Sequence, residues 1–320
     1  MIPEKTAPQP DGAQQQVRIL IAENRSKRKW SRWLEKMMPT LLFLLTSVTV
    51  LTTLTILFTL LTETVLFFKQ VSILEFFTGT ILKPLSQQPE FGILPLINAT
   101  LISTFIAMIV AVPIGMMTAI YLSEFASPGI RRIVKPILEV LAGIPTIVYG
   151  FFAITFVTPL LKYIIPGLET TNILSPGIVM GIMIVPMIAS MSEDAMGAVP
   201  LDMREGALAL GATKLEACLK VVVPAALSGI IASFVLGISR AIGETMIVTI
   251  ASGSSKQFTF DITQSMQTMT AYIVEVTGGD ASAGSTIYYS LYAVAMTLFA
   301  FTFIMNLIAR KITKHFREGY

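Results

Sequence analysis

The sequence has few of the residues that build catalytic or metal sites. Its 320 residues include one cysteine, Cys218, and one histidine, His315. A single cysteine cannot close an internal disulfide, and a single histidine cannot supply a multi-histidine metal site. No Gly-Lys dipeptide occurs, so the phosphate-binding loop Gly-x-x-x-x-Gly-Lys of P-loop ATPases is absent. We therefore expect this chain to have no catalytic residues and to bind no metal or cofactor.

Charged residues are also scarce. They make up 13% of the chain, whereas hydrophobic residues make up 53%. A soluble domain usually carries about 25% charged residues, because its surface must face water. The charges here are too few to cover a globule of this size, so lipid is expected to replace much of the water. The net charge is only +3, and no nucleic-acid partner is expected.

Six apolar stretches are long enough to cross the hydrocarbon core of a bilayer, which is ~30 Å thick and needs about 20 helical residues. Open sheets would expose unpaired backbone groups to lipid, and these runs lack the alternation of a membrane barrel. Helices are therefore predicted for all six. The predicted spans are Leu41–Phe68, Ile93–Leu122, Pro136–Ile165, Pro176–Met191, Ala225–Ser252 and Thr286–Ala309.

The polar segments divide the chain into three parts. Residues 1–36 are predicted to be a polar and basic tail, of which residues 1–16 are rich in Pro and Gln and expected to be disordered. Residues 37–310 form the membrane domain, and residues 311–320 form a second basic tail. Most of the 23 Lys and Arg residues fall in the tails and in alternate loops, so the positive-inside rule predicts that both termini are cytoplasmic. The opposite segments contain Lys69, Lys83, Lys162 and Lys256.

Two patterns inside the spans are interpreted as structural. Threonines recur at helical spacing in the first span, where each hydroxyl can bond the carbonyl one turn back. Gly177 and Gly181 are spaced so that a neighbouring helix can approach closely. The threonine stripe consists of Thr52, Thr55, Thr59 and Thr62.

The polar segment 192–224, between the fourth and fifth spans, is the most informative part of the chain. Pro200 sits where a helix can begin, and Asp202 and Glu205 are expected in its favourable first turn. Gly211 permits a turn, and a second short helix is expected to follow. A pair of short, partly apolar helices suits docking into a groove on a partner. The apolar side of the first helix consists of Ala207, Leu208 and Leu210.

This segment resembles the coupling-loop signature of ATP-binding-cassette (ABC) import permeases. The signature is Glu-(Ala)-Ala, three residues, Gly, nine residues and Ile-x-Leu-Pro. It matches Glu205, Ala207, Gly211 and the run Val221 to Pro224. Pro224 is also expected to end the second helix. Valines replace the Ile and Leu, and Gly206 replaces the first Ala, which weakens the helix by up to ~1 kcal/mol. In that family the loop docks on the ATPase subunit. The resemblance assigns ATPase coupling to Glu205, Gly206, Ala207, Gly211 and Pro224.

Arg240 and Glu244 lie in the fifth predicted span, where charged side chains are costly. Each costs roughly 2.5–3.5 kcal/mol at mid-bilayer, so such residues usually face a partner or a polar path. On a continuous helix they would lie one turn apart on the same face. Either they neutralise each other, or Arg240 binds a tetrahedral oxyanion through bidentate hydrogen bonds. Glu244 would then accept a hydrogen bond from protonated phosphate, which fully ionised sulfate cannot donate.

Three stretches resemble the phosphate-specific branch of these permeases, within a similarity that covers nearly all of residues 40–310. They are Phe-Gly-Ile-Leu-Pro-Leu at 91–96, Leu-Ala-Gly-Ile-Pro-Thr-Ile-Val-Tyr-Gly at 141–150 and Ser-Arg-Ala-Ile-Gly-Glu-Thr-Met at 239–246. The first and third resemble the PstC type more than its PstA-type sister. The hypothesised substrate path consists of Ser239, Arg240, Glu244 and Thr245.

The resemblance implies an all-α integral membrane protein with the six-helix fold of type I ABC importer permeases, in the bacterial inner membrane. It also implies a PstA-type second permease, a PstB-type ATPase dimer and a PstS-type extracytoplasmic phosphate-binding protein as partners, besides membrane lipid. ATP would be used by the partner ATPase rather than by this chain.

Other functions stay open on the sequence alone. A permease of the same class could carry sulfate or molybdate, or the chain could be the PstA-type sister subunit. An ion-driven secondary transporter would need no ATPase, and the loop match would then be a coincidence. A membrane-embedded enzyme has no support, because the sequence offers no nucleophile–histidine pair, paired mid-membrane carboxylates or metal cluster.

Overall fold

The computed structural model describes residues 12–279 and 281–317, and the side chains of residues 33–279 and 281–313. The chain divides into two compact units, Met1–Thr59 and Leu60–Tyr320. Helices account for most of the described residues, as the sequence predicts. Two short strands, β1 (Leu82–Lys83) and β2 (Glu90–Phe91), pair antiparallel.

Helix α1 (Gly12–Phe68) contains all the described residues of the first unit and the first turns of the second. Residues 12–16 are helical, so the expected disorder is wrong for them, and residues 1–11 lie outside the described part. Alanine and glutamine favour helices, and within α1 no proline occurs before Pro39. The threonine stripe behaves as predicted. Its hydroxyls donate to carbonyls one turn back, at 2.8 Å for Thr52 and 2.9 Å for Thr55 and Thr59.

Among the described residues, four helices are long and apolar enough to cross a membrane. Two further pairs of helical segments pass the same test together, each pair bent at a short break. With each pair counted as one span, up to six spans are present, but the second pair, Lys214–Ala225 with Leu227–Ile242, begins and ends earlier than the predicted fifth span. The four single spans lie in α1, in α3 (Leu94–Ile120) with its π-helical extension η1 (Tyr121–Phe125), in α7 (Leu174–Gly197) and in α14 (Thr286–Arg317).

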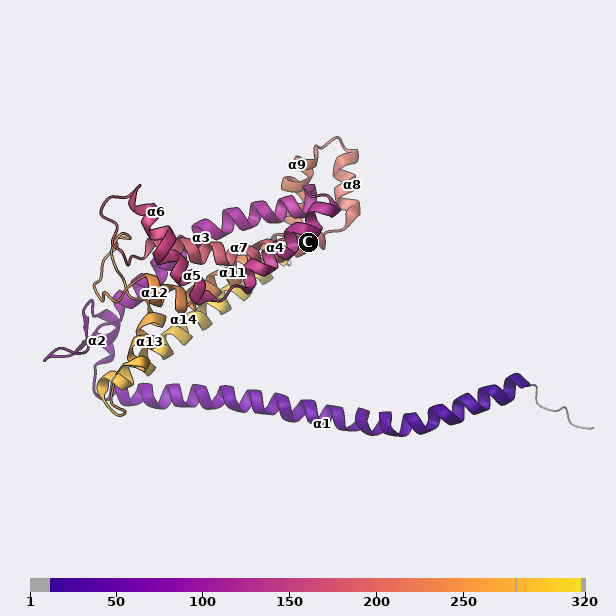
Figure 1. Ribbon diagram of the computed structural model, residues 1–320, viewed down its shortest axis with the longest axis horizontal. Coiled ribbons are helices and arrows are strands. Elements are labelled where there is room, and N and C mark those ends of the chain that lie inside the picture. The colour runs from indigo at the N-terminus through magenta and orange to yellow at the C-terminus, as the bar shows by residue number, and fades with distance from the viewer. Residues whose placement is uncertain (1–11, 280, 318–320) are drawn as a thin grey trace, which may run out of the picture. The chain divides into compact units, whose positions relative to one another are not determined.

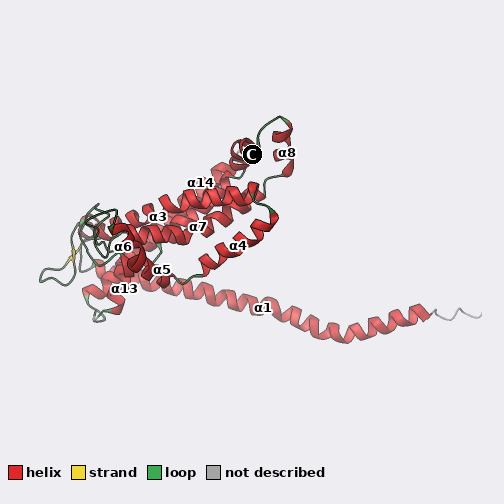
Figure 2. Ribbon diagram, turned by 45° about the horizontal axis from the view of Figure 1, so that its top comes forward, coloured by secondary structure: helices red, strands yellow, loops and turns green. Residues whose placement is uncertain are grey.

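The third predicted span, Pro136–Ile165, is broken rather than continuous. Helix α4 (Pro128–Gly143) and the helical segment Thr146–Lys162 meet at 87°. Ile144 is extended, with ψ 129°, because the residue before a proline avoids the helical region, and Pro145 has no N–H to continue the ladder. Figure 2 shows the break between α4 and α5. The second segment consists of α5 (Thr146–Phe152), η2 (Ala153–Val157) and α6 (Thr158–Lys162).

The fifth predicted span, Ala225–Ser252, is also broken. Helix α11 (Leu227–Ile242) ends before Gly243, and α12 (Met246–Ala251) begins after Thr245. Glycine has a low helix propensity, and the Glu244 side chain bonds the first amides of α12 instead of continuing α11. At its other end α11 meets the helical segment Lys214–Ala225 at 72°.

Helix α7 is the central helix of the second unit. It packs along α3 and also contacts α11 and α4 (Figure 1). The predicted span Pro176–Met191 is too short, and residues 192–197 of the predicted loop are helical. The helix continues through Ser192 and Glu193 because both are buried with polar partners. The core around α7 includes Val179, Met180, Ile184 and Ile188.

Short elements gather at the two ends of this bundle (Figure 1). Helices α8 (Leu201–Ala209) and α9 (Lys214–Ala217) lie at one end. At the opposite end lie α2 (Ile73–Thr78), α6, α12 and α13 (Met269–Gly278). Edge-to-face aromatic contacts stabilise that end, because the Phe67 ring centroid lies 5.4 Å from that of Phe76 and 5.5 Å from that of Phe91. The bundle therefore holds two separate sets of loops apart.

Glycines allow the close approach of α3 and α7, as predicted for Gly177 and Gly181. A Cβ atom on Gly177 would lie 2.8 Å from the Ile106 side chain, and one on Gly181 would lie 2.7 Å from the Ala107 carbonyl oxygen. A backbone oxygen cannot move aside as a flexible side chain can. Gly181 is therefore the stricter of the two positions.

Gly181→Ala is expected to lower the free energy of unfolding by about 1–3 kcal/mol, because the added methyl overpacks the contact between α3 and α7. Gly197 is the last residue of the same helix and has open space where a Cβ would lie, so Gly197→Ala is the matched control. Thermal unfolding of the purified protein in detergent measures both. Equal midpoints for the two variants would contradict this account of the packing.

Candidate functional site

The segment between α7 and α11 forms the pair of helices that the sequence predicts. Helix α8 begins directly after Pro200 with Asp202 in its first turn, whereas Glu205 falls in the next turn, beyond the first turn expected for it. Gly211 then has a φ of +89°, a conformation that glycine adopts without the strain a side chain would cause. The predicted turn at Gly211 is therefore confirmed.

The second helix of the pair begins at α9 and continues through η3 (Cys218–Val222) and α10 (Val223–Ala225). A reciprocal capping box starts it, in which Thr213 and Glu216 each bond the other's backbone N–H. These hydrogen bonds from Thr213 hold the pKa of Glu216 below its usual range. Pro224 lies inside α10 and the break comes at Ala226, so the expectation that Pro224 ends the helix is wrong.

The outer face of this helix pair is apolar and exposed. Leu201 is 66% exposed and Leu210 is 91% exposed, although leucines usually avoid water. Glu205 and Gly206 are exposed beside them, whereas Ala207 is half-buried. Exposed leucines on short helices are typical of a protein interaction site.

A largely enclosed ion pair ties this helix pair to the bundle. Arg204 of α8 lies 3.3 Å from Glu124 in η1, and their side chains are only 18% and 9% exposed. Arg204 also donates a hydrogen bond to the Met196 carbonyl oxygen at the end of α7. Lys214 of α9 stands 5.3 Å from the centroid of the Phe125 ring, a cation–π contact. The helix pair is therefore attached through charged groups to the ends of both α3 and α7.

Apolar packing completes this attachment. A cluster beneath the helix pair joins residues of α3, of the end of α7, of η3 and of α11. Cys218 is buried beside it, and burial raises the pKa of its thiol. Displacing the helix pair would therefore displace the bundle helices as well. The cluster consists of Ala119, Met196, Val199, Val222, Ala226 and Ile230.

A second set of ion pairs joins α4 to α7 near the same end. Glu193 of α7 is 5% exposed, and its two carboxylate oxygens face different cations. Arg131 Nε lies 3.5 Å from Oε1, and Lys135 Nζ lies 3.1 Å from Oε2. Arg131 also donates hydrogen bonds to the carbonyl oxygens of Leu122 and Ser123. Arg131, Lys135 and Glu193 thus hold α4, which precedes the break at Pro145, against the bundle.

Arg240 and Glu244 do not share a helix face, so the one-turn spacing expected for them is wrong. Helix α11 ends between them, and no ion pair joins these two described residues. Glu244 is buried, and its Oε1 accepts hydrogen bonds from Met246 N at 3.1 Å and Ile247 N at 3.3 Å. Its carboxylate therefore caps α12 at the favourable N-terminus.

Arg240 lines a cavity of about 480 Å³ between α4, α7 and α11. Its guanidinium is exposed to this space, and its Nη2 lies 4.0 Å from the Met183 sulfur. Lys135 and Glu193 line the same cavity, together with Glu139 and Asp194. The cavity therefore combines a guanidinium, an ammonium and carboxylates, which can bind a polar ion.

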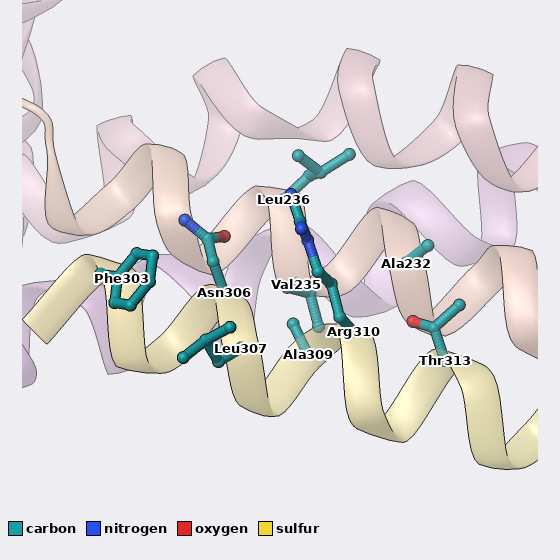
Figure 3. Close-up of a pocket in the computed structure, with 9 residues that line it drawn as sticks. All are labelled: Ala232, Val235, Leu236, Phe303, Asn306, Leu307, Ala309, Arg310 and Thr313. Carbon is teal, nitrogen blue, oxygen red and sulfur yellow. The ribbon is translucent and has the colours of Figure 1, made fainter. Parts of the chain in front are cut away.

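Ser239 and Thr245 lie apart from that cavity. Ser239 Oγ donates to Asn306 Oδ1 at 2.9 Å, across the contact between α11 and α14. Asn306 lines a second cavity of about 600 Å³, whose other walls are mostly apolar and which also contains Arg310 (Figure 3). Thr245 Oγ1 donates to the Gly243 carbonyl oxygen at 3.2 Å, within the break after α11. Of the four hypothesised path residues, only Arg240 lines the charged cavity.

Sequence reasoning did not single out Glu124, Arg204 or Glu193. Glu124 and Glu193 lie at the polar ends of apolar spans, where a charged residue ordinarily reaches water, and Arg204 lies in the loop helix α8. One signal was present, because the predicted span Pro176–Met191 is short for a membrane helix and Glu193 follows it closely. Their pairing could not be read from the chain, since each partner lies in another helix.

Curated proteins similar to this chain are permeases. It is 32% identical to "Probable ABC transporter permease protein YqgH" of Bacillus subtilis, over 76% of this chain and 78% of that protein. It is 32% identical to "Phosphate transport system permease protein PstC" of Xylella fastidiosa, over 75% and 79% of the two chains. It is 33% identical to "Phosphate transport system permease protein PstC 1" of Mycobacterium tuberculosis, over 70% and 72%.

Solved structures show the same fold at lower identity. A bacterial ABC transporter involved in the import of the acidic polysaccharide alginate aligns with a TM-score of 0.63 at 16% identity, over 88% of this chain and 98% of that chain. The MetNI methionine ABC transporter, in an inward facing conformation, aligns with a TM-score of 0.52 at 16% identity, over 70% and 94%. The predicted fold of an ABC importer permease is therefore confirmed.

The family match covers the parts of the chain described above. Residues 111–318 match the family described as "Binding-protein-dependent transport system inner membrane component". This range includes the ion pairs of Glu124 and Glu193, the exposed helix pair and Arg240. Together with the apolar helices, it defines a multi-pass permease of the inner membrane. The chain belongs to the family of binding-protein-dependent transport system inner membrane components.

Proposed function

We propose that this chain is the PstC-type permease subunit of an ATP-driven importer of inorganic phosphate. The observation that carries the choice of substrate is 32–33% identity to proteins named PstC, across the region that holds the helix pair and Arg240. The same names favour phosphate over sulfate or molybdate, and PstC over its PstA-type sister. An arginine lining a cavity that also holds other charged side chains supports an oxyanion, because its guanidinium matches the geometry of one.

The exposed helix pair α8–α9 is the proposed contact with a PstB-type ATPase. The exposed Leu201 and Leu210 would enter a groove on the ATPase. Arg204 binds the helix pair to Glu124 of the bundle. Movement of the ATPase would then be transmitted to α3 and α7 rather than absorbed by a flexible loop. ATP would be consumed by that partner, and this chain would supply no catalytic residue.

The remaining partners and the orientation follow the same proposal. Lys and Arg residues concentrate in the tails and in the segments at the end that holds α8, and under the positive-inside rule this supports a cytoplasmic location for both termini and the helix pair. A PstA-type permease would form the other half of the path, and a PstS-type protein would deliver phosphate to the opposite face.

Glu205→Lys is expected to dislodge or uncouple the ATPase, because it reverses an exposed charge beside the apolar docking surface. The measurement is the amount of ATPase that co-purifies with the permease in mild detergent, together with phosphate uptake. Lys220→Glu is a comparable reversal on an exposed residue of η3 and should have the smaller effect. Full co-purification and uptake by the Glu205 variant would argue against docking there.

Arg204→Met is expected to reduce phosphate uptake far more than it reduces ATP hydrolysis. Removing one partner of a buried ion pair typically costs about 3–5 kcal/mol, since the other charge is left unpaired, and here that charge is Glu124. Lys220→Met breaks an exposed pair with Glu216 and should cost at most about 1 kcal/mol. Uptake and hydrolysis are compared in proteoliposomes. Parallel losses of both in the Arg204 variant would contradict a transmitting role.

Arg240→Ala is expected to abolish phosphate uptake while the complex still assembles. Its guanidinium is exposed to the cavity and forms no ion pair among the described residues, so removing it leaves no buried charge behind. Arg310→Ala removes an arginine from the other cavity and is the matched control. Radiolabelled phosphate uptake and gel filtration measure the two effects. Normal uptake by Arg240→Ala would refute a role in the path.

A further inference from the structure

A groove between α11 and α14 lies in the membrane-spanning part of the chain. It is the cavity of about 600 Å³ shown in Figure 3, and it shares no lining residue with the cavity of Arg240. Its α14 wall belongs to the span Thr286–Thr313. Leu236, Phe303 and Leu307 line the groove and are exposed, so it opens on the surface that lipid covers.

The groove is apolar toward one end of its α14 wall and polar toward the other. Asn306, Arg310 and Thr313 are spaced by four and three residues, so they follow one face of the helix. Because a helix rises 1.5 Å per residue, Arg310 lies about 10 Å further along α14 than Phe303. Figure 3 shows the Arg310 side chain extending from α14 toward α11. The apolar walls include Ala232, Val235, Leu236, Phe303 and Leu307.

The polar end of the groove offers donors and a positive charge. Arg310 is the one charged residue among those that line the groove, and it forms no ion pair with any described residue. Asn306 Oδ1 accepts the hydrogen bond of Ser239, which leaves the amide N–H groups of Asn306 as donors. No carboxylate lines this groove in the described part of the chain, so its polar end suits an anionic group.

The position of Arg310 along the span identifies the kind of anion. It lies in the last turn of the span Thr286–Thr313, at the level where lipid headgroups begin. The sequence continues with Lys311, Lys314 and Arg317 before its next acidic residue, Glu318. Basic clusters directly after a membrane span attract anionic lipids, and basic pockets between membrane helices bind their headgroups. Here such a cluster and such a pocket occur on one helix.

We propose that the groove between α11 and α14 binds an anionic phospholipid. Arg310 holds its phosphate through charge-assisted hydrogen bonds, Asn306 adds a neutral donor, and one acyl chain lies against Phe303 and Leu307. The lipid thereby braces the contact of α11 with α14 beside the hydrogen bond between Ser239 and Asn306. The site requires only that the chain spans a membrane, so it is independent of the transported substrate.

Fluorescence quenching by brominated lipid tests the site. A Phe303→Trp variant of the full-length permease is reconstituted in phosphatidylcholine with a rising fraction of dibrominated phosphatidylglycerol or, separately, of dibrominated phosphatidylcholine. Bromines at the middle of the acyl chain lie near the depth of residue 303, because half of the hydrocarbon core is ~15 Å thick. Phosphatidylglycerol should reach half-maximal quenching at a several-fold lower fraction than phosphatidylcholine. The unsubstituted chain measures the background from Trp30 and Trp33.

Ile304→Trp is the matched control for the probe. Ile304 is exposed on the same helix but does not line the groove, so the two brominated lipids should quench this variant equally. Should Phe303→Trp fail to assemble, Leu307→Trp probes the same wall.

Arg310→Ala in the Phe303→Trp background should remove the preference for phosphatidylglycerol, because the groove then contains no charge. Lys311→Ala deletes the neighbouring exposed cation, which does not line the groove, and should keep the preference. A preference that persists without Arg310 would overturn the proposal. So would its loss in both variants, since the overall charge of the tail would then attract the lipid.

Two further outcomes would also overturn the site. Equal quenching of residue 303 by both lipids would mean that Arg310 only reaches for water beside ordinary lipid. Absence of quenching by either lipid would mean that protein, such as a second permease, covers the groove. Phosphate uptake by the unsubstituted complex is measured separately, so failure of the lipid site and failure of the proposed function are told apart.

Discussion

The rest of the structure depends on the ion pair between Arg204 and Glu124. Both side chains are largely withdrawn from water, so neither is stable without the other. Because Arg204 lies on α8 and Glu124 follows α3, the pair fixes the exposed helix pair to the transmembrane bundle. The Met196 carbonyl and the apolar cluster around Val222 add the end of α7 to the same assembly. A helix pair attached in this way is bound to α3 and α7 by side chains, whereas a loop tethered only by its backbone would not be.

The breaks in α4–α5 and α11–α12 follow from a related constraint. A helix interrupted within a membrane frees backbone groups that lipid cannot satisfy, so each interruption needs an internal partner. After α11, the Glu244 carboxylate bonds the first amides of α12, and Thr270 donates to the Glu244 carbonyl oxygen at 2.7 Å. The Tyr149 hydroxyl of α5 donates to the Leu141 carbonyl oxygen of α4 at 2.8 Å. Glu244, which the sequence suggested as a substrate ligand, thus stabilises the backbone instead.

The sequence predicted features that depend on neighbouring residues and missed those that depend on distant ones. The turn at Gly211, the start of α8 after Pro200 and the close contact at Gly181 follow from local conformation or helical spacing, and the structure confirms them. Hydropathy gave six spans but placed a continuous helix through Gly243, because apolar composition does not record a break. The pairing of Glu193 with Lys135 joins two helices whose approach only the folded chain defines.

Glu193 takes part in two features that the fold joins. Its carboxylate holds α4 against α7 through Arg131 and Lys135. It also lines the cavity between α4, α7 and α11, as Lys135 does. A buried carboxylate that loses its cations is costly, so a movement of α4 away from α7 would have to replace both ion pairs. The shape of this cavity and the position of α4 are therefore coupled through one carboxylate.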